Sequence, residues 1–490
     1  MLKNKSSKVG TKDKKIRKDL RPRDKETRAM VRDQLNKVSP SFCLAKWYQV
    51  TIHLQNGQTH SCHHPWTHKV DLRDLSTNPS ALHNTPHKKI QRYKMLKGER
   101  PDECDYCWRI EDSNVENISD RTFKSAEQWA LPNLDEARTM PWDYDFTPRY
   151  VEVSFSNACN FKCIYCAPHI SSSIMTEFQK HGHYTESPEF SLEYLDVSGL
   201  TPIRYDAHNP YVDAFWRWWP ELIKKLEHFR ITGGEPLLNH NTFRVLDFIK
   251  AEPQPKLNFA INSNLGIPDA QYDRFLESMK VILENKSINS FEFYTSIDTY
   301  GKQAEYIRNG LNYKHYMDNV RRFLVELPVD TKLVFMCTYN ALSLPSFNLF
   351  LEDVAQLKRE FRNSINEPRV ILDMPYLRAP SYLSLAVLPE SFSSYISDSF
   401  FFMKRHSVNF LKEDWLFNYH ELSKIERVLN WFQSLPKEGY EVRDLRKSFY
   451  TFLREHDRRR SLSFTETFPE MVDFYQLCED VYNNDKTEVN

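Results

Sequence analysis

The stretch Ser-Asn-Ala-Cys-Asn-Phe-Lys-Cys-Ile-Tyr-Cys-Ala-Pro (residues 156–168) directly follows a segment with the pattern of a β-strand. Its cysteines, Cys159, Cys163 and Cys166, have the spacing Cys-x3-Cys-x2-Cys. A cubic [4Fe-4S] cluster contains four irons, so three thiolate ligands leave one iron free to bind a group that is not protein. The spacing therefore indicates an iron–sulfur site with one open position.

A second motif, Ile-Thr-Gly-Gly-Glu-Pro (residues 231–236), also ends a strand pattern. The chain has only 11 glycines in 490 residues, and Gly233-Gly234 is the one adjacent pair. Neighbouring glycines at a strand end indicate that the backbone comes very close to a ligand. The alternative interpretation of both motifs is a zinc site beside an ordinary glycine turn.

In this order, the two motifs resemble those of the radical S-adenosylmethionine (SAM) superfamily. The resemblance implies that the three cysteines hold a [4Fe-4S] cluster and that SAM chelates its open iron through amino and carboxylate groups. Reductive cleavage of the S–C5′ bond would then release a 5′-deoxyadenosyl radical, which abstracts hydrogen from an unactivated C–H bond. The residues that the resemblance places around SAM are Tyr165, against the adenine, and Gly233, Gly234, Glu235 and Pro236, at the methionine amino group.

A third segment, Tyr294–Gly301, is similar to the Ser-x-Asp-Gly element of peptide-acting radical SAM proteins, although residue 299 is Thr here. Short polar side chains at the carboxyl end of a strand suit a hydroxyl or carboxylate ligand. Ser296 and Asp298 are therefore predicted to contact the ribose or the carboxylate of SAM.

A second group of cysteines precedes these motifs. Cys43 is followed by a strand pattern over residues 46–54 and a turn at Asn56-Gly57, which predict a hairpin that brings Cys43 and Cys62 together. Cys104 and Cys107 would supply two more thiolates, and four would saturate a metal site. The pattern resembles the twitch domain and the first part of the SPASM motif, which implies an auxiliary [4Fe-4S] cluster. In those relatives the auxiliary domain follows the core, whereas here it precedes it.

Zinc remains the alternative for this second group. A zinc ribbon also uses four cysteines, and histidines surround Cys62, so mixed ligation is possible as well. These histidines are His60, His63, His64 and His68.

Strand and helix patterns alternate from residue 149 to residue 389, which predicts a parallel β/α sheet. The resemblance implies a partial (β/α)6 barrel. Ligands of such sheets bind at the carboxyl ends of the strands, where both motifs lie. The predicted strands are Tyr150–Ser156, Phe229–Thr232, Leu257–Asn262, Phe291–Ile297, Lys332–Thr338 and Val370–Met374.

The predicted organisation has five parts. They are a basic tail (1–38), a cysteine-rich hairpin domain (39–112), a connector with one helix around residues 122–131 (113–148), the core (149–389) and a helical extension (390–490). Residues 1–37 hold fourteen Lys or Arg against five Asp or Glu, which indicates either a solubilising tail or a contact with an acidic partner.

Two further stretches have alternative interpretations. The aromatic residues 215–220 lie in a long insertion (183–221) and indicate either a substrate lid or apolar packing. The run Asp-Arg-Arg-Arg-Ser (457–461) indicates a solvated corner, with a contact to a phosphate or substrate carboxylate as the alternative.

The composition limits which functions, partners and cellular locations we expect. A net charge of zero implies no general attraction to nucleic acid, no run is long enough to span a membrane, and there is no targeting signal. Nine mostly grouped cysteines favour metal ligation in a reducing, cytoplasmic compartment. We expect a radical SAM enzyme that acts on a peptide or protein and is reduced by a flavodoxin or ferredoxin. The alternatives are a nucleotide, RNA or small-metabolite substrate, or a non-catalytic iron–sulfur or zinc protein.

Overall fold

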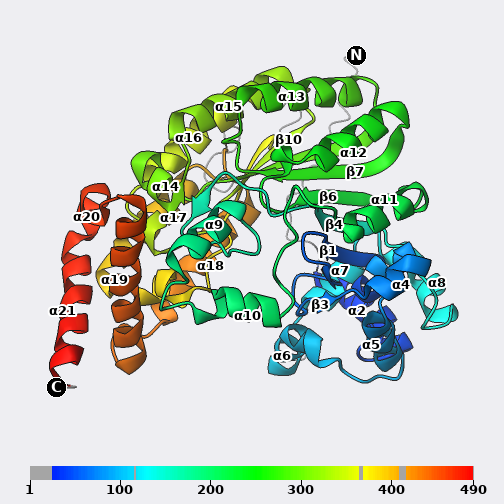
Figure 1. Cartoon of the computed structure of the whole chain (residues 1–490), viewed down its shortest axis with the longest axis horizontal. Coiled ribbons are helices and arrows are strands. Elements are labelled where there is room, and N and C mark those ends of the chain that lie inside the picture. The colour runs from blue at the N-terminus through cyan, green and yellow to red at the C-terminus, as the bar shows by residue number, and fades with distance from the viewer. Residues whose placement is uncertain (1–24, 115–116, 363–367, 408–414, 489–490) are drawn as a thin grey trace, which may run out of the picture.

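The computed structural model describes residues 25–114, 117–362, 368–407 and 415–488, so most of the basic tail lies outside the described residues. Its centre is a nine-stranded sheet that is flanked by helices (Figure 1). The strands in spatial order are β11 (Val370–Asp373), β10 (Lys332–Met336), β8 (Ile288–Ser296), β7 (Gln254–Ser263), β6 (His228–Thr232), β4 (Tyr150–Ser154), β1 (Gln49–His53), β2 (Gln58–His60) and β3 (His68–Lys69).

The six predicted core strands are all present and pair in parallel with one another. Burial alternates along them because one face packs on helices, and Phe229, Phe259 and Phe291 form a row across it with ring centroids 6.0 and 5.7 Å apart. The parallel α/β prediction is confirmed, and closure into a partial barrel stays a prediction. The helices between these strands are α9 (Ser172–His181), α10 (Leu192–Val197), α11 (Pro210–Leu222), α12 (His240–Ala251), α13 (Asp269–Glu284), α14 (Gly301–Ile307), α15 (Tyr313–Glu326) and α16 (Phe347–Glu360).

The cysteine-rich hairpin continues the core sheet. Strand β1 pairs in parallel with β4, from Gln49 opposite Tyr150 to His53 opposite Ser154, and β2 and β3 add antiparallel strands beyond it. The strand predicted from residue 46 starts three residues later, because residues 45–48 form the short helix α3 (Ala45–Tyr48), with all four side chains buried. The hairpin is thus tied to the core by backbone hydrogen bonds.

A second hydrophobic core lies under this part of the chain. It consists of buried side chains that lie between Val31 and Phe146 in the sequence, and these include Trp47, Trp108, Trp129 and Cys107. The connector helix is shorter than expected, since it ends at Ser125 and the chain then turns to bury Trp129 and Ala130. The helices of this region are α2 (Lys25–Val38), α4 (Leu72–Thr77), α5 (Pro86–Leu96), α6 (Asp105–Ser113), α7 (Asp120–Ser125) and α8 (Leu134–Thr139).

The aromatic residues of the insertion belong to the core. Phe215 and Trp219 on α11 are 0% and 2% exposed, and the Trp219 ring lies 5.1 Å from that of Phe229 on β6. Apolar packing, rather than a lid, is therefore the correct interpretation of this cluster.

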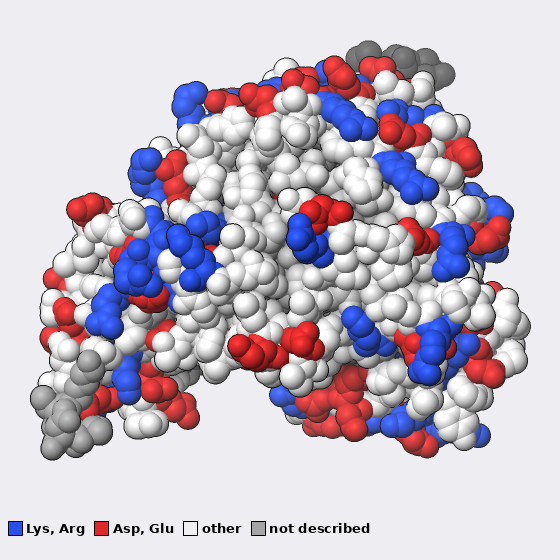
Figure 2. Space-filling model, viewed as in Figure 1, with Lys and Arg blue, Asp and Glu red and all other residues white. Residues whose placement is uncertain are grey.

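The C-terminal region is helical, as predicted, and α19 and α21 run side by side at one end of the molecule (Figure 1). Acidic and basic side chains are interspersed over the visible face, in line with the zero net charge (Figure 2). No helix of the described chain combines the length and apolar character of a membrane span. The C-terminal helices are α17 (Ser393–Arg405), α18 (Tyr419–Ser434), α19 (Tyr440–Arg460), α20 (Phe464–Thr467) and α21 (Val472–Glu488).

Two fully buried histidines predict an acid-sensitive fold. Burial lowers the pKa of His456 on α19 to about 4 and that of His83 well below its ordinary value. The unfolded chain protonates both near pH 6.5, so their contribution to stability is complete above that pH and is lost as the pH falls toward 4.

Each histidine should therefore cost up to about 1.4 kcal/mol of unfolding free energy per pH unit in this window. Chemical denaturation at pH 7, 6 and 5 should show this slope, and His456→Gln should reduce it by one histidine's share. His183→Gln, at an exposed position, is the control. Equal slopes in the two variants would contradict the assignment to His456.

Candidate functional site

The three cysteines of the first motif lie on one loop, directly after β4. Cys163 belongs to the short strand β5 (Lys162–Cys163), which pairs with β9 (Arg308–Asn309), and the Ile164 N–H donates to the Ile307 carbonyl at 2.8 Å. We call residues 159–166 the cysteine loop. All three thiols are half-buried, and burial raises the pKa of Cys159 to about 12, with Cys163 as the next largest influence. In the described residues no three His, Cys, Asp or Glu side chains are grouped to hold a single metal ion.

Hydrogen-bond donors point at the sulfur of Cys159. The Phe161 N–H lies 3.5 Å from its Sγ, and the Asn264 amide lies 3.9 Å away. Asn264 also donates to the Asn160 side chain at 3.0 Å, so the carboxyl end of β7 supports the loop. Such donors stabilise a thiolate and any cluster that it binds.

A buried arginine stands beside the second cysteine. Arg308 is 5% exposed and donates to Cys163 Sγ at 3.5 Å. Its guanidinium also pairs with Asp298, with Nε to Oδ2 at 2.9 Å, and donates to Tyr165 Oη at 2.5 Å. Burial works against the charge of Arg308, but Asp298 holds its pKa well above the ordinary value. Arg308 therefore places a fixed positive charge against a cysteine of the loop.

Asp298 is enclosed by these partners. It is 0% exposed, accepts from Tyr165 Oη at 2.9 Å and from the Thr338 N–H at 3.0 Å, and faces Arg308. In this structure it orients Tyr165, while direct contact with SAM stays a prediction. Ser296, at the end of β8, is half-buried on the same edge of the sheet.

Sequence reasoning did not find Arg308. It lies between α14 and α15, outside both motifs, and only the pairing of β9 with β5 brings it to Cys163. No local pattern around residue 308 signals this contact.

The two glycines let the end of β6 pack against residues 154–158, the segment that leads into the cysteine loop. The Gly234 N–H donates to Ser156 O at 3.3 Å and the Glu235 N–H to Ala158 O at 2.6 Å. A Cβ on Gly233, whose φ is +123°, would lie 2.5 Å from Ser154 Oγ, and one on Gly234 would overlap the backbone of residues 157 and 158. Both glycines are thus closely packed against the neighbouring segment, and close approach of their backbone to a ligand stays a prediction.

Glu235 and Pro236 are buried behind this contact. Glu235 is 1% exposed and accepts from the Asn264 N–H at 2.6 Å, the Leu237 N–H at 3.0 Å and Ser263 Oγ at 2.8 Å. Burial raises its pKa to about 7. The side chain joins the carboxyl ends of β6 and β7, and Asn264 continues the connection to Cys159.

Comparison with known proteins gives one family. Residues 153–356 match the model described as the Radical SAM superfamily. These residues form a radical SAM superfamily domain. The match begins in β4 and ends in α16, so it includes the cysteine loop, the glycine motif and Arg308. No curated protein matches the chain.

A radical SAM domain implies a [4Fe-4S] cluster and SAM, and the loop fits the cluster. Three thiols share one short segment, N–H donors point at Cys159, and Arg308 offsets negative charge at Cys163. The four N-terminal cysteines, Cys43, Cys62, Cys104 and Cys107, lie outside the matched residues. The family match therefore does not bear on the resemblance to a twitch or SPASM domain.

The glycine motif of the radical SAM domain gives a stability prediction. Gly233→Ala should cost about 1 to 2 kcal/mol from its positive φ and a further ~1–3 kcal/mol from overlap with residues 154 and 156. Gly439→Ala is the matched control, because its φ is +108° but no atom lies within 4 Å of the added Cβ. Denaturant titration of both metal-free variants measures the difference, and equal losses would show that the close packing at Gly233 does not matter.

The second group of cysteines surrounds one pocket. Cys43, Cys62, Cys104 and Cys107 all line it. Burial raises the pKa of Cys104 and of Cys107 to about 12. Three cationic side chains line the same pocket and would offset the charge of bound thiolates: Lys46, Arg121 and Lys124.

The nearby histidines are engaged elsewhere. His60 contacts the Cys62 carbonyl and His53, and His68 contacts Thr85 Oγ1 at 2.7 Å. Of the four histidines around Cys62, His64 alone lines the pocket, and its Nε2 is paired with Asp120 at 2.8 Å. His64 is thus the one histidine of these four that lies beside the four cysteines.

Proposed function

We propose that this protein is a radical SAM enzyme that cleaves SAM reductively and abstracts hydrogen from a peptide or protein substrate. The observation that carries the proposal is that the glycine motif bonds to residues 156 and 158, directly before the cysteine loop, inside the matched domain. Cys159, Cys163 and Cys166 would hold the cluster. With SAM bound to it, the cluster supplies one-electron cleavage of the S–C5′ bond and a 5′-deoxyadenosyl radical.

The surrounding residues would prepare the site for SAM. Asp298 and Arg308 fix the hydroxyl end of Tyr165, which holds the ring in one orientation for packing on the adenine. Gly233, Gly234, Glu235 and Pro236 would present backbone groups to the methionine amino group, and Ser296 a hydroxyl to the ribose or carboxylate. These assignments follow from the resemblance of the motifs to those of the radical SAM superfamily, and the position of the residues at the carboxyl edge of the sheet supports them.

We further propose that the N-terminal cysteines hold an auxiliary [4Fe-4S] cluster. Support comes from the single pocket that all four line and from the cations around it. Four thiolates would leave no iron open, which suits electron transfer. Iron, sulfide and zinc analysis of a variant with Cys43, Cys62, Cys104 and Cys107 changed to Ala tests this. Loss of about four of about eight irons is expected, whereas loss of zinc would identify a zinc ribbon.

A peptide or protein substrate is proposed from the resemblance of the N-terminal cysteines and of the Ser296-x-Asp298 element to peptide-acting relatives. A flavodoxin or ferredoxin would supply the electron. The competing substrate is RNA or a nucleotide, for which the excess charge of residues 1–37 is the support. Truncation should stop at residue 24, because Val31 and Leu35 on α2 belong to the second core. Unchanged activity of that variant would argue against nucleic acid.

The decisive experiment is anaerobic. Reconstituted protein with a reductant and SAM is expected to form 5′-deoxyadenosine, measured by mass spectrometry, and more of it with a true substrate. No 5′-deoxyadenosine from protein that holds its full iron content would overturn the enzymatic proposal.

A further inference from the structure

The basic run at the end of α19 is not a solvated corner. The Arg458 side chain is 61% exposed, as expected, but those of Arg459 and Arg460 are 3% and 2% exposed. Burial of two guanidinium groups requires partners, and these partners lie around the cysteine loop.

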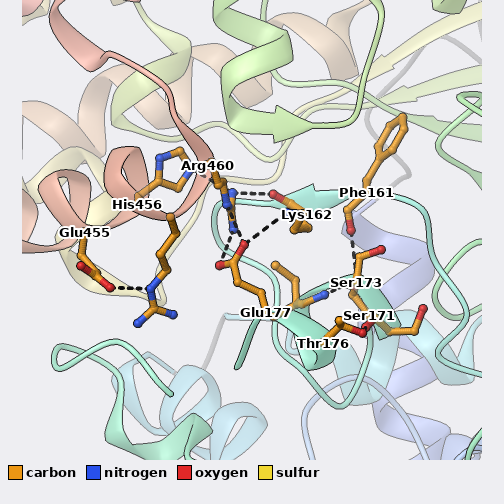
Figure 3. Close-up of polar contacts among 12 residues, drawn as sticks. Phe161, Lys162, Ser171, Ser173, Thr176, Glu177, Glu455, His456 and Arg460 are labelled. Atoms are coloured by element: carbon orange, nitrogen blue, oxygen red, sulfur yellow. Dashed lines mark hydrogen bonds and ion pairs between the residues drawn. The ribbon is translucent and has the colours of Figure 1, made fainter. Parts of the chain in front are cut away.

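Arg460 joins α19 to the loop and to α9. Figure 3 shows its guanidinium between the Glu177 carboxylate and the Lys162 carbonyl. The distances are 3.0 Å from Nε to Glu177 Oε2, 3.1 Å from a terminal nitrogen to Oε1, and 2.8 Å from the other terminal nitrogen to Lys162 O. Lys162 directly precedes Cys163, and Arg460 also lines a small pocket with Tyr165 and Cys166.

Asp457 bonds to the helix that leads into the opposite strand. It accepts from Tyr306 Oη at 2.5 Å, near the end of α14, and from the Phe464 N–H at 2.7 Å. Residue 306 is two positions before Arg308 on β9, the strand that pairs with β5. The last turn of α19 therefore contacts strand β5 directly at Lys162, and it contacts the end of α14, which leads into strand β9.

Helix α9 is attached at the same place. Glu177 is 4% exposed on its side chain, accepts from Tyr184 Oη at 2.9 Å and lies 3.6 Å from Lys162 Nζ. Arg459 donates to Gly182 O at 2.9 Å, just after α9 ends. The start of the insertion, α9, the loop and α19 thus meet at one buried ion pair.

We propose that the end of α19 is a clamp that sets the shape of the cysteine loop before metal binds, with Arg460 as its positioning residue. The inference rests on the proposed cluster-binding function of the loop. Arg460 donates to the backbone of the loop at the Lys162 carbonyl, so it acts through the position of the ligands. A loop held in its ligand-binding shape loses less conformational entropy when the cluster binds. The C-terminal extension is accordingly part of the cluster site.

The test separates the clamp from plain stability. Arg460→Met leaves Glu177 buried without its cation, which destabilises the fold by itself. In Arg460→Met/Glu177→Met both charges are gone, but the donor to Lys162 O is still missing. Arg458→Met is the matched control, because Arg458 lies two positions before Arg460 and is exposed. Hydrogen exchange of residues 161–166 in the metal-free protein, thermal unfolding and iron content after reconstitution are measured for each.

The double variant should recover much of the melting temperature that the single variant loses. Its Ile164 amide should still exchange about tenfold faster than in the wild type, and its iron content should stay low. Arg458→Met should match the wild type. If the single variant does not fold, Arg460→Lys, which keeps the charge beside Glu177 but not the guanidinium fork, should fold and show the faster exchange.

If the double variant exchanges at the wild-type rate and binds as much iron as the wild type, the clamp proposal is overturned. It is also overturned if Arg458→Met changes the exchange rate and the iron content as much as the double variant does. Failure of the wild type to bind iron would instead overturn the proposed function. The exchange measurement on metal-free protein decides on the clamp in either case.

Discussion

Changing Cys159, Cys163 and Cys166 together to Ala is expected to leave about four of about eight irons per chain and to abolish 5′-deoxyadenosine formation. The reason is that SAM requires the open iron of this cluster, whereas a cluster held by the four N-terminal cysteines is saturated. Anaerobic reconstitution followed by iron analysis and mass spectrometry measures both effects.

Cys478→Ala is the control for this experiment. That cysteine is 0% exposed on α21, within the large hydrophobic core, so its loss should lower stability but keep the iron and the reaction. Retention of all irons in the triple variant would show that the loop does not hold a cluster. Persistent 5′-deoxyadenosine would place SAM cleavage elsewhere.

Arg308→Met should have the next largest effect. It removes the cation beside Cys163 and leaves the Asp298 carboxylate buried and uncompensated, which should cost about 3–5 kcal/mol of unfolding free energy. The remaining negative charge should also disfavour the reduced cluster, so its midpoint potential should fall. Denaturant titration of the metal-free protein and a redox titration followed by electron paramagnetic resonance measure these changes.

Asp298→Asn is the opposite change at the same site. It removes the negative charge and keeps Arg308, so the midpoint potential should rise. If both variants move the potential in the same direction, the charge pair does not tune the cluster, and the effects of the two substitutions come from loss of packing.

Local patterns predicted much of the fold. Each predicted core strand is present within a few residues, and helices alternate with these strands as expected. Periodicity succeeds here because each core strand or helix buries one face, and the spacing of apolar residues records that face directly. Periodicity failed at residues 45–48, because all four side chains of this single helical turn are buried and burial therefore does not alternate along it.

The chemistry was also predictable in part. Cys159, Cys163 and Cys166 fall within eight residues, so local spacing by itself places them on one short segment. The side chains that support these cysteines could not be predicted, because they come from distant parts of the sequence. Arg308 is 145 positions from Cys163, and Arg460 is 298 positions from Lys162. An arginine in a helical extension looks the same in sequence whether it faces water or a buried carboxylate.

The sequence by itself determined the alternation of strands and helices and the two motifs at the carboxyl ends of β4 and β6, since both depend on residues close together in the chain. Only the tertiary structure decided that the N-terminal hairpin joins the core sheet through β1 and β4, that Arg308 faces Cys163, and that Arg460 at the end of α19 bonds to the cysteine loop. The physical reason is that buried charges and open strand edges must be paired in the folded chain, and their partners can lie hundreds of residues away in the sequence.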